Sequence, residues 1–264
     1  MLTFIGLAQN SFGQRYSATG ARATAMASTS VLLNDAYGLF NNPGSTETKT
    51  LAFLASFNTN YLSLGIHDAQ FGLVIPNRKT VWGAGVNYYG DKLFNQLTIS
   101  GLIGHQVGFG RIGLRLNYHQ YYLENYGYKR TASLDLGGRF ELSEQVSIGM
   151  LIANLSRAKL DRDSSESLGS LLKVGLSYQP IKKIRLDLEV KKNINLPISS
   201  SLGIEYQIGE YVLARTGFDF TNAIAALGLG LNLKQFQLDL AGQYQPDLGI
   251  SGTLSLLISK KHDE

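Results

Sequence analysis

The chain has 264 residues, a formal net charge of +4 and a mean hydropathy of -0.03. That average is too polar for a bundle of membrane helices, and the scattered Lys and Arg residues form no basic run of the kind that binds nucleic acid. The absence of cysteine excludes disulfides, thiolate metal sites and cysteine nucleophiles.

The first residues carry no charge and include an apolar piece, Leu2 to Ala8. A complete secretory signal peptide has a cationic start and a longer apolar core, so residues 1–13 are predicted to be the remnant of one. An exported protein of the cell envelope is therefore the expectation.

Residues 14–48 show no alternation and are rich in small residues, as in Gly20 to Ala27 and Asn34 to Gly44. Such a composition suits a compact, partly helical insert. Residues 14–48 are predicted to form a small N-terminal plug.

Apolar and polar residues alternate through the remainder with a period of two, which is the period of a β-strand. In residues 235–245, for example, Phe236 and Leu238 lie on one face and Gln237 and Asp239 on the other. About fourteen alternating segments follow one another: 49–61, 68–76, 80–90, 92–106, 111–119, 129–141, 145–155, 170–179, 184–191, 200–208, 211–220, 223–233, 235–245 and 249–259.

An even number of strands returns both chain ends to one side, as in bacterial membrane barrels. Connections after even-numbered segments are tight, whereas the longest one, residues 156–168, follows an odd-numbered segment. That asymmetry matches short periplasmic turns and longer external loops. Residues 49–259 are predicted to form an all-β, transmembrane antiparallel β-barrel, followed by a polar C-terminal tail, residues 260–264.

Alternation alone does not separate a membrane barrel from a soluble β-sandwich or a lipocalin-like barrel. Tyrosines on the apolar faces favour the membrane. Tyr88, Tyr118 and Tyr244 come near the ends of odd-numbered strands, and Tyr178 and Tyr206 near the ends of even-numbered ones. These positions fall at the two membrane boundaries, where outer-membrane barrels carry aromatic girdles.

A barrel of about fourteen strands is too wide for wall side chains to fill, so the plug is expected to occupy the lumen. Charges of both signs are expected to line it: Arg111, Arg115, Asp135, Arg139, Arg185, Asp187, Glu189, Glu205, Arg215 and Asp239. A lattice of salt bridges that braces the wall and holds the plug through Arg22 and Asp35 is favoured. A substrate-selective lining is the alternative.

The sequence shows no clear set of catalytic residues. The four histidines lack metal-ligand spacing, so neither a metal nor a cofactor is expected. An outer-membrane lipase would need a Ser/His pair with an orienting partner; Ser133, His119 and Asp135 fall on neighbouring strands, but any polar-lined hairpin offers such a trio. The alternating glycines of residues 227–231 are predicted to be small residues on the inner face of a strand, because no helix follows them.

Short motifs resemble the N-terminal signature of the FadL-like outer-membrane barrels, especially the PorV/PorQ group of the Bacteroidota. The matching plug positions are Gly20, Ala21, Arg22, Met26, Asp35, Asn42 and Pro43, and residues 202–206, 213–217 and 243–249 are also similar to that family. The resemblance covers the chain after Gln14. Ala27 and Gly44 depart from the pattern, which has Gly and Ala there, so the plug geometry is expected to differ.

The resemblance implies a fourteen-stranded barrel with an N-terminal plug in the bacterial outer membrane. PorV and PorQ serve type IX secretion and the surface attachment of secreted proteins, so the chain is predicted to be a partner subunit of a secretion or outer-membrane assembly complex. The alternative is a FadL-like transporter of a hydrophobic small molecule, with Leu39 and Phe40 of the plug along the route. Outer-membrane lipid is the other expected partner, and a lipase is the third and least favoured possibility.

Overall fold

The computed structural model describes the chain apart from residues 1–17, 63–64, 161–167, 195, 247 and 261–264. The predicted signal-peptide remnant and nearly all of the predicted tail lie outside the described residues.

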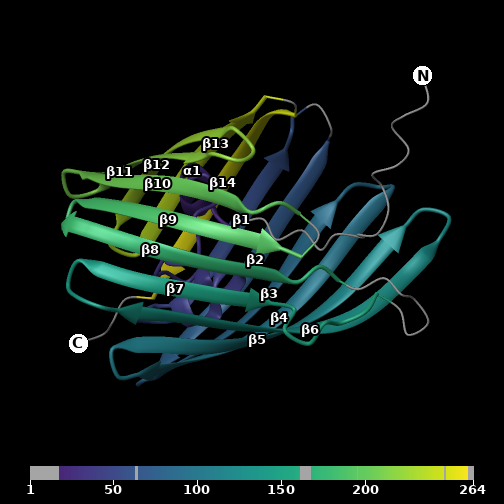
Figure 1. Ribbon diagram of the computed structural model, residues 1–264, viewed down its shortest axis with the longest axis horizontal. Coiled ribbons are helices and arrows are strands. Elements are labelled where there is room, and N and C mark those ends of the chain that lie inside the picture. Colours follow the sequence, from purple (N-terminus) through teal and green to yellow (C-terminus); the bar gives the residue numbers. More distant parts are fainter. Residues whose placement is uncertain (1–17, 63–64, 161–167, 195, 247, 261–264) are drawn as a thin grey trace.

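Within the described residues, fourteen antiparallel strands form one closed barrel (Figure 1). Each strand pairs with the strands before and after it in sequence, and β1 closes the barrel against β14. The strands are β1 (Ala52–Asn60), β2 (Ile66–Asn77), β3 (Thr80–Gly90), β4 (Phe94–Val107), β5 (Gly110–Leu123), β6 (Gly127–Glu141), β7 (Val146–Ala153), β8 (Leu171–Ile181), β9 (Ile184–Asn193), β10 (Ser199–Ile208), β11 (Val212–Asp219), β12 (Ile224–Leu233), β13 (Phe236–Gln245) and β14 (Gly249–Ser259). The predicted fold class and strand number are confirmed.

The two ends of the barrel differ in their connections. Ala52 pairs with Ser259, so the wall begins and ends at the same end. Connections at this end are short, the longest being residues 142–145 between β6 and β7. The opposite end carries the longest connection of the barrel, residues 154–170 between β7 and β8. We call these the short-turn end and the long-loop end.

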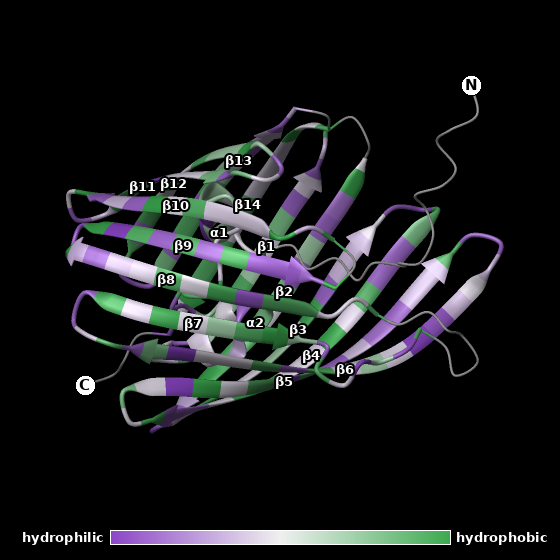
Figure 2. Cartoon of the chain, in the orientation of Figure 1, coloured by the Kyte–Doolittle hydropathy of each residue, from purple (hydrophilic) through white to green (hydrophobic). Residues whose placement is uncertain are grey.

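Large apolar side chains cover the outside of the wall. On β5, Leu114 and Leu116 are 43% and 62% exposed, whereas Arg115 and Asn117 between and beside them are 6% and 3% exposed. Figure 2 shows this alternation as bands along the strands. A soluble barrel keeps its apolar face inside, so this inverted arrangement is that of a barrel in lipid.

The tyrosines expected at the membrane boundaries all face outward. Tyr88, Tyr118 and Tyr244 lie toward the long-loop end, and Tyr178 and Tyr206 toward the short-turn end. Each tyrosine is exposed on the outer surface. Their placement at both rims matches the aromatic girdles of membrane barrels.

Among the residues described before the wall, three form short helical elements: α1 (Ala21–Ala25), α2 (Gly38–Asn41) and the 3-10 helix η1 (Pro43–Ser45). They lie inside the barrel (Figure 1), where α1 contacts β11 to β14 and η1 contacts β4 to β7. None of the described helices is long and apolar enough to cross a membrane. Buried apolar clusters form where this segment meets the wall, and another lies within the segment itself, so the main core of the protein consists of the plug and the wall around it.

Candidate functional site

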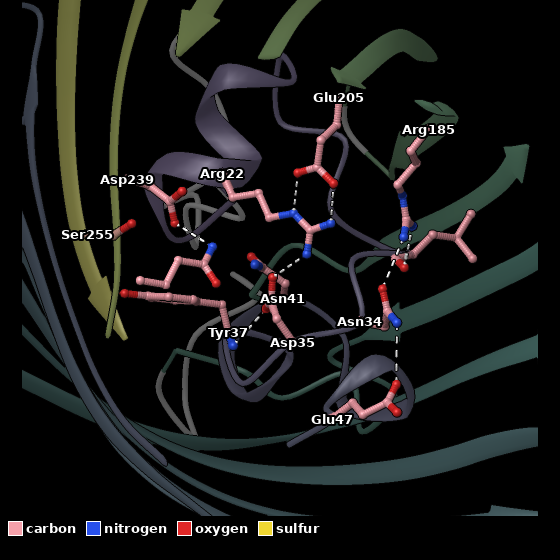
Figure 3. A network of polar contacts seen from close by, with 12 residues as sticks. Arg22, Asn34, Asp35, Tyr37, Asn41, Glu47, Arg185, Glu205, Asp239 and Ser255 are labelled. Atoms are coloured by element: carbon pink, nitrogen blue, oxygen red, sulfur yellow. Dashed lines mark hydrogen bonds and ion pairs between the residues drawn. The ribbon is translucent and has the colours of Figure 1, made fainter. Parts of the chain in front are cut away.

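Arg22 lies at the centre of the contact between plug and wall (Figure 3). Its Nε and Nη2 atoms donate to the two carboxylate oxygens of Glu205 on β10, at 2.8 and 2.7 Å, and its Nη1 atom donates to Asp35 at 2.9 Å. Glu205 also accepts from Arg215 at 2.6 Å, and Arg215 pairs with Asp239 at 2.6 Å. Alternating charges therefore run from the plug through β10 and β11 to β13.

This chain of charges holds Arg22 as a cation. Burial lowers the pKa of its guanidinium, but the carboxylates of Glu205 and Asp35 outweigh burial and hold the pKa above its usual range. Buried pairs of this kind need both partners, because removing one leaves the other charge without compensation.

Tyr37 ties the plug to the seam where the barrel closes. Its backbone N–H donates to Asp35 at 2.9 Å, and its hydroxyl lies 2.7 Å from the carbonyl oxygen of Ala55 on β1 and 3.0 Å from that of Leu256 on β14. Burial raises the pKa of the hydroxyl, so that it remains a donor. A Cβ on Gly20 would lie 3.1 Å from the ring of Tyr37, and Gly20 has a φ of +91°, which favours glycine.

A second group of contacts holds the middle of the plug against β8 and β9. Glu189 accepts from the backbone N–H of Ser30, at 2.7 Å, and from that of the next residue. Arg185 donates to the carbonyl oxygen of Leu32 at 2.7 Å. Lys173 lies 3.1 Å from Glu189 and donates to the hydroxyl of Ser30 at 2.8 Å. Wall charges here satisfy backbone groups that the short plug helices leave unpaired.

A third group holds the end of the plug against β5 and β6. Arg115 donates to the carbonyl oxygen of Leu39 at 2.8 Å, and Arg111 to that of Thr46 at 2.5 Å. The side-chain amide of Asn42 donates within the plug and, at 3.3 Å, to the carbonyl oxygen of Gly138. The plug is thus fixed on opposite sides of the lumen.

Inward-facing glycines let the plug backbone touch the wall. A Cβ on Gly113 of β5 would lie 2.3 Å from the carbonyl oxygen of Pro43. A Cβ on Gly217 of β11 would lie 2.3 Å from the carbonyl carbon of Met26. These distances leave no room for a side chain, so the wall is recessed where the plug backbone approaches it closely. Gly228, from the glycine run expected on an inner face, likewise faces the side chain of Ala25.

The structure places the seven predicted plug positions in the lumen. Ala21 is fully buried, and its N–H donates to Ser255 of β14 at 3.0 Å. Met26 is also fully buried and packs over Gly203. The other five take part in the contacts above: Gly20, Arg22, Asp35, Asn42 and Pro43.

The predicted lumen charges all face inward. Besides the pairs already described, Arg115 pairs with Asp135 at 2.7 Å and Arg185 with Asp187 at 2.9 Å. Arg139 differs, because it lies at the short-turn end, 3.2 Å from the exposed carboxylate of Glu141. Arg22 contacts the wall directly, whereas Asp35 is bonded to Arg22 and Tyr37, two plug residues that contact the wall.

Two residues that hold the plug are absent from the predicted site. Lys173 stands between Leu172 and Val174, so the same alternation that identified the other lumen charges also indicates it. Tyr37 lies in the part of the chain that lacks alternation, where no sequence signal points to its contacts with two strands.

The structure brings Ser133 and His119 together, but not as a catalytic triad. The hydroxyl of Ser133 lies 2.9 Å from Nε2 of His119, and the hydroxyl of Thr98, rather than a carboxylate, lies 3.0 Å from Nδ1. Asp135 instead accepts from Arg115. Ser133 and His119 are 2% and 0% exposed, so a substrate does not reach them in this state.

No group of three or more His, Asp or Glu residues that could hold a metal ion occurs in the described part of the chain.

Two cavities lie between the plug and the long-loop end. The first, here called the β4 cavity, has a volume of about 80 Å³ and is lined by plug residues, including Phe40 and Asn41, and by side chains of β2 to β8. The second, the β9 cavity, has a volume of about 460 Å³, and its lining includes Lys191 and Asn193 of β9 and Gln243 of β13. Lys173 lines both.

Solved structures with the same fold include a hydrocarbon channel and a toluene transporter by name. One is the CymD monoaromatic hydrocarbon channel, which is 13% identical, with 94% of this chain and 99% of that chain covered and a TM-score of 0.68. The toluene transporter TodX of Pseudomonas putida is 12% identical, with 94% and 100% covered and a TM-score of 0.70. A FadL homologue of Pseudomonas aeruginosa is 11% identical, with 91% and 98% covered and a TM-score of 0.66.

At these identities the likeness establishes the fold and does not establish a family or a substrate. No family model matches the sequence, and no curated protein matches it. Membership of the PorV/PorQ group, an origin in the Bacteroidota and the absence of enzymatic activity therefore stay predictions.

Proposed function

We propose that this protein is a bacterial outer-membrane channel that passes a hydrophobic small molecule through its lumen. The observation that carries the proposal is an apolar seam between α2 and the wall. It consists of Leu39 and Phe40 on the plug side and Leu54, Val74, Val81 and Leu102 on β1 to β4.

The apolar seam runs along the lumen from the β4 cavity to the short-turn end. Phe40 lines the cavity, whereas Val81 lies next to the first residue of β3 and Val74 lies near the end of β2, both at the short-turn end. A molecule that leaves the cavity along this line meets apolar groups, whereas paired charges line the wall on β5 and β6 and on β10, β11 and β13. The seam is therefore a favourable route for an apolar solute.

Glycines in the wall leave space for the plug side chains of the seam. A Cβ on Gly83 would lie 2.9 Å from a methyl group of Leu39, and one on Gly85 would lie 2.6 Å from the ring of Phe40. The two plug side chains therefore fill recesses in the wall. If α2 moved, the recesses would open as an apolar passage.

The structural neighbours support the same function. Their names describe a monoaromatic hydrocarbon channel, a toluene transporter and a FadL homologue, and the fold extends over nearly the whole of each chain. Of the two functions suggested by the sequence, this likeness favours hydrophobic transport over type IX secretion.

Toluene uptake by cells tests the proposal. Cells that express the protein should take up toluene faster than cells that lack it, and Leu39→Ala with Phe40→Ala should increase the rate further, because the double variant widens the seam. Leu33→Ala is the matched control, since Leu33 is a buried plug leucine outside the seam. Equal uptake with and without the protein, together with no toluene binding by the purified protein, would contradict the proposal.

A partner subunit of the PorV/PorQ type is the second candidate. The plug is fixed on several sides by charged and backbone contacts, which is the arrangement expected of a barrel that serves as a scaffold and conducts nothing. A pull-down in mild detergent that returns only this chain would argue against it.

A further inference from the structure

We propose that the β4 cavity binds an uncharged polar group, a hydroxyl or an amide, of the molecule that the channel passes. The inference rests on the proposed function, because it assigns a substrate class to the same route. The substrate is then an amphiphile whose apolar body follows the apolar seam.

Neutral hydrogen-bonding side chains dominate the lining of the β4 cavity. They come from the plug and from β3, β4 and β5, and include Asn41, Asn87, Gln96, Thr98 and Asn117. Amides and hydroxyls offer both donors and acceptors, which is the chemistry that recognises a hydroxyl or an amide. The volume of about 80 Å³ is below the usual range for whole drug-sized ligands, so the cavity suits one polar group of a substrate.

The charged side chains of the lining are already engaged. Arg115 pairs with Asp135 at 2.7 Å, and Lys173 pairs with Glu189 at 3.1 Å. The carboxylate of Asp68 accepts from the amide of Asn87 at 2.9 Å. A bound anion would have to compete with buried carboxylates for both cations, which disfavours a substrate with a charged head.

A pure hydrocarbon is disfavoured for the opposite reason. It would displace water from the amides and hydroxyls without replacing the lost hydrogen bonds, and each such loss is unfavourable. A hydroxyl or amide on the substrate restores one or two of those bonds.

The lining of the same cavity also has an apolar side. Phe40, Leu151 and Leu171 contribute to the lining. Phe40 also belongs to the apolar seam. A polar group bound by Asn87 and Thr98 therefore leaves the attached apolar body pointing toward the seam.

Three probes with one ring and different heads separate the alternatives: benzyl alcohol, toluene and benzoate. Their dissociation constants are measured with the full chain in lipid nanodiscs, with empty nanodiscs as the blank. Benzyl alcohol should bind about 10-fold more tightly than toluene, the effect of one well-made hydrogen bond, and more tightly than benzoate. Thr98→Val and Asn87→Leu should each weaken benzyl alcohol binding about 5-fold and should strengthen toluene binding, because each removes a polar group that toluene leaves without a hydrogen bond.

Gln243→Leu is the matched control, because Gln243 lines the β9 cavity instead; it should change none of the three constants. Toluene binding as tightly as benzyl alcohol, or benzoate binding most tightly, would overturn the inference and leave hydrophobic transport standing. If none of the three probes bound, the proposed function would fail together with the inference.

Discussion

Replacing Arg22 by Ala should loosen α1 of the plug while leaving the barrel wall intact. Arg22 makes three hydrogen bonds to two carboxylates, at 2.7 to 2.9 Å, and its side chain is 15% exposed. Without it, Glu205 keeps Arg215 as a partner, but Asp35 loses its only guanidinium contact among the described residues. Removing one member of a buried pair costs about 3–5 kcal/mol.

Hydrogen exchange of α1 measures this effect. The amide of Thr24 donates to Gly20 at 3.1 Å, and that of Met26 to Ala23 at 3.2 Å, so both exchange only when the plug opens locally. A loss of 3–5 kcal/mol corresponds to exchange faster by about 100-fold to about 3,000-fold. Exchange of the strand amides of β5 should not change, because those amides bond to neighbouring strands.

Arg139→Ala is the matched control. Its carboxylate neighbours, Glu47 and Glu141, are 45% and 61% exposed, so the pairs contribute at most about 1 kcal/mol. Exchange of α1 in the Arg139 variant should stay within about 5-fold of the wild type. If Arg22→Ala left the exchange of α1 within the same limit, the role of Arg22 as the main anchor of the plug would be refuted.

Two further changes test the plug and the lipid face. In Gly217→Val, the new Cβ would lie 2.3 Å from the backbone of Met26, so this variant should displace the plug and raise ion conductance in planar bilayers. Gly252→Val is the control and should leave conductance unchanged, because a Cβ there meets nothing within 4 Å. Equal conductance of the two variants would contradict the close contact at Gly217. Leu116 faces outward and is 62% exposed, so Leu116→Arg should lower the free energy of unfolding in lipid vesicles by about 2–4 kcal/mol, as measured by urea titration. If the variant were as stable as the wild type, position 116 would not lie in lipid.

The strands could be predicted because their signal is local. In β8, Lys173 and Ser177 alternate with Leu172 and Leu176, and a period of two specifies both the strand and its inward face. The same alternation gave the inward orientation of the lumen charges. Turn residues between the alternating segments then fixed the order of the wall.

The partners of the lumen charges could not be predicted in the same way. Arg22 and Glu205 are 183 positions apart, and Ser30 and Glu189 are 159 apart. Which inward side chain meets which part of the plug depends on the stagger of all the strands around the barrel, and alternation contains no information on stagger. The apolar seam is hidden for the same reason, since α2 and β1 to β4 supply its two sides separately.

The bonds from Tyr37 to Ala55 and Leu256 have a consequence for biogenesis. Its phenolic oxygen contacts β1, the first strand of the wall to be synthesised, and β14, the last. If the barrel closed before the plug was inside, the plug would have to enter afterwards through a lumen lined with charged side chains. We therefore expect residues 18–48 to act as a template that is in place before the final strand pairs with the first.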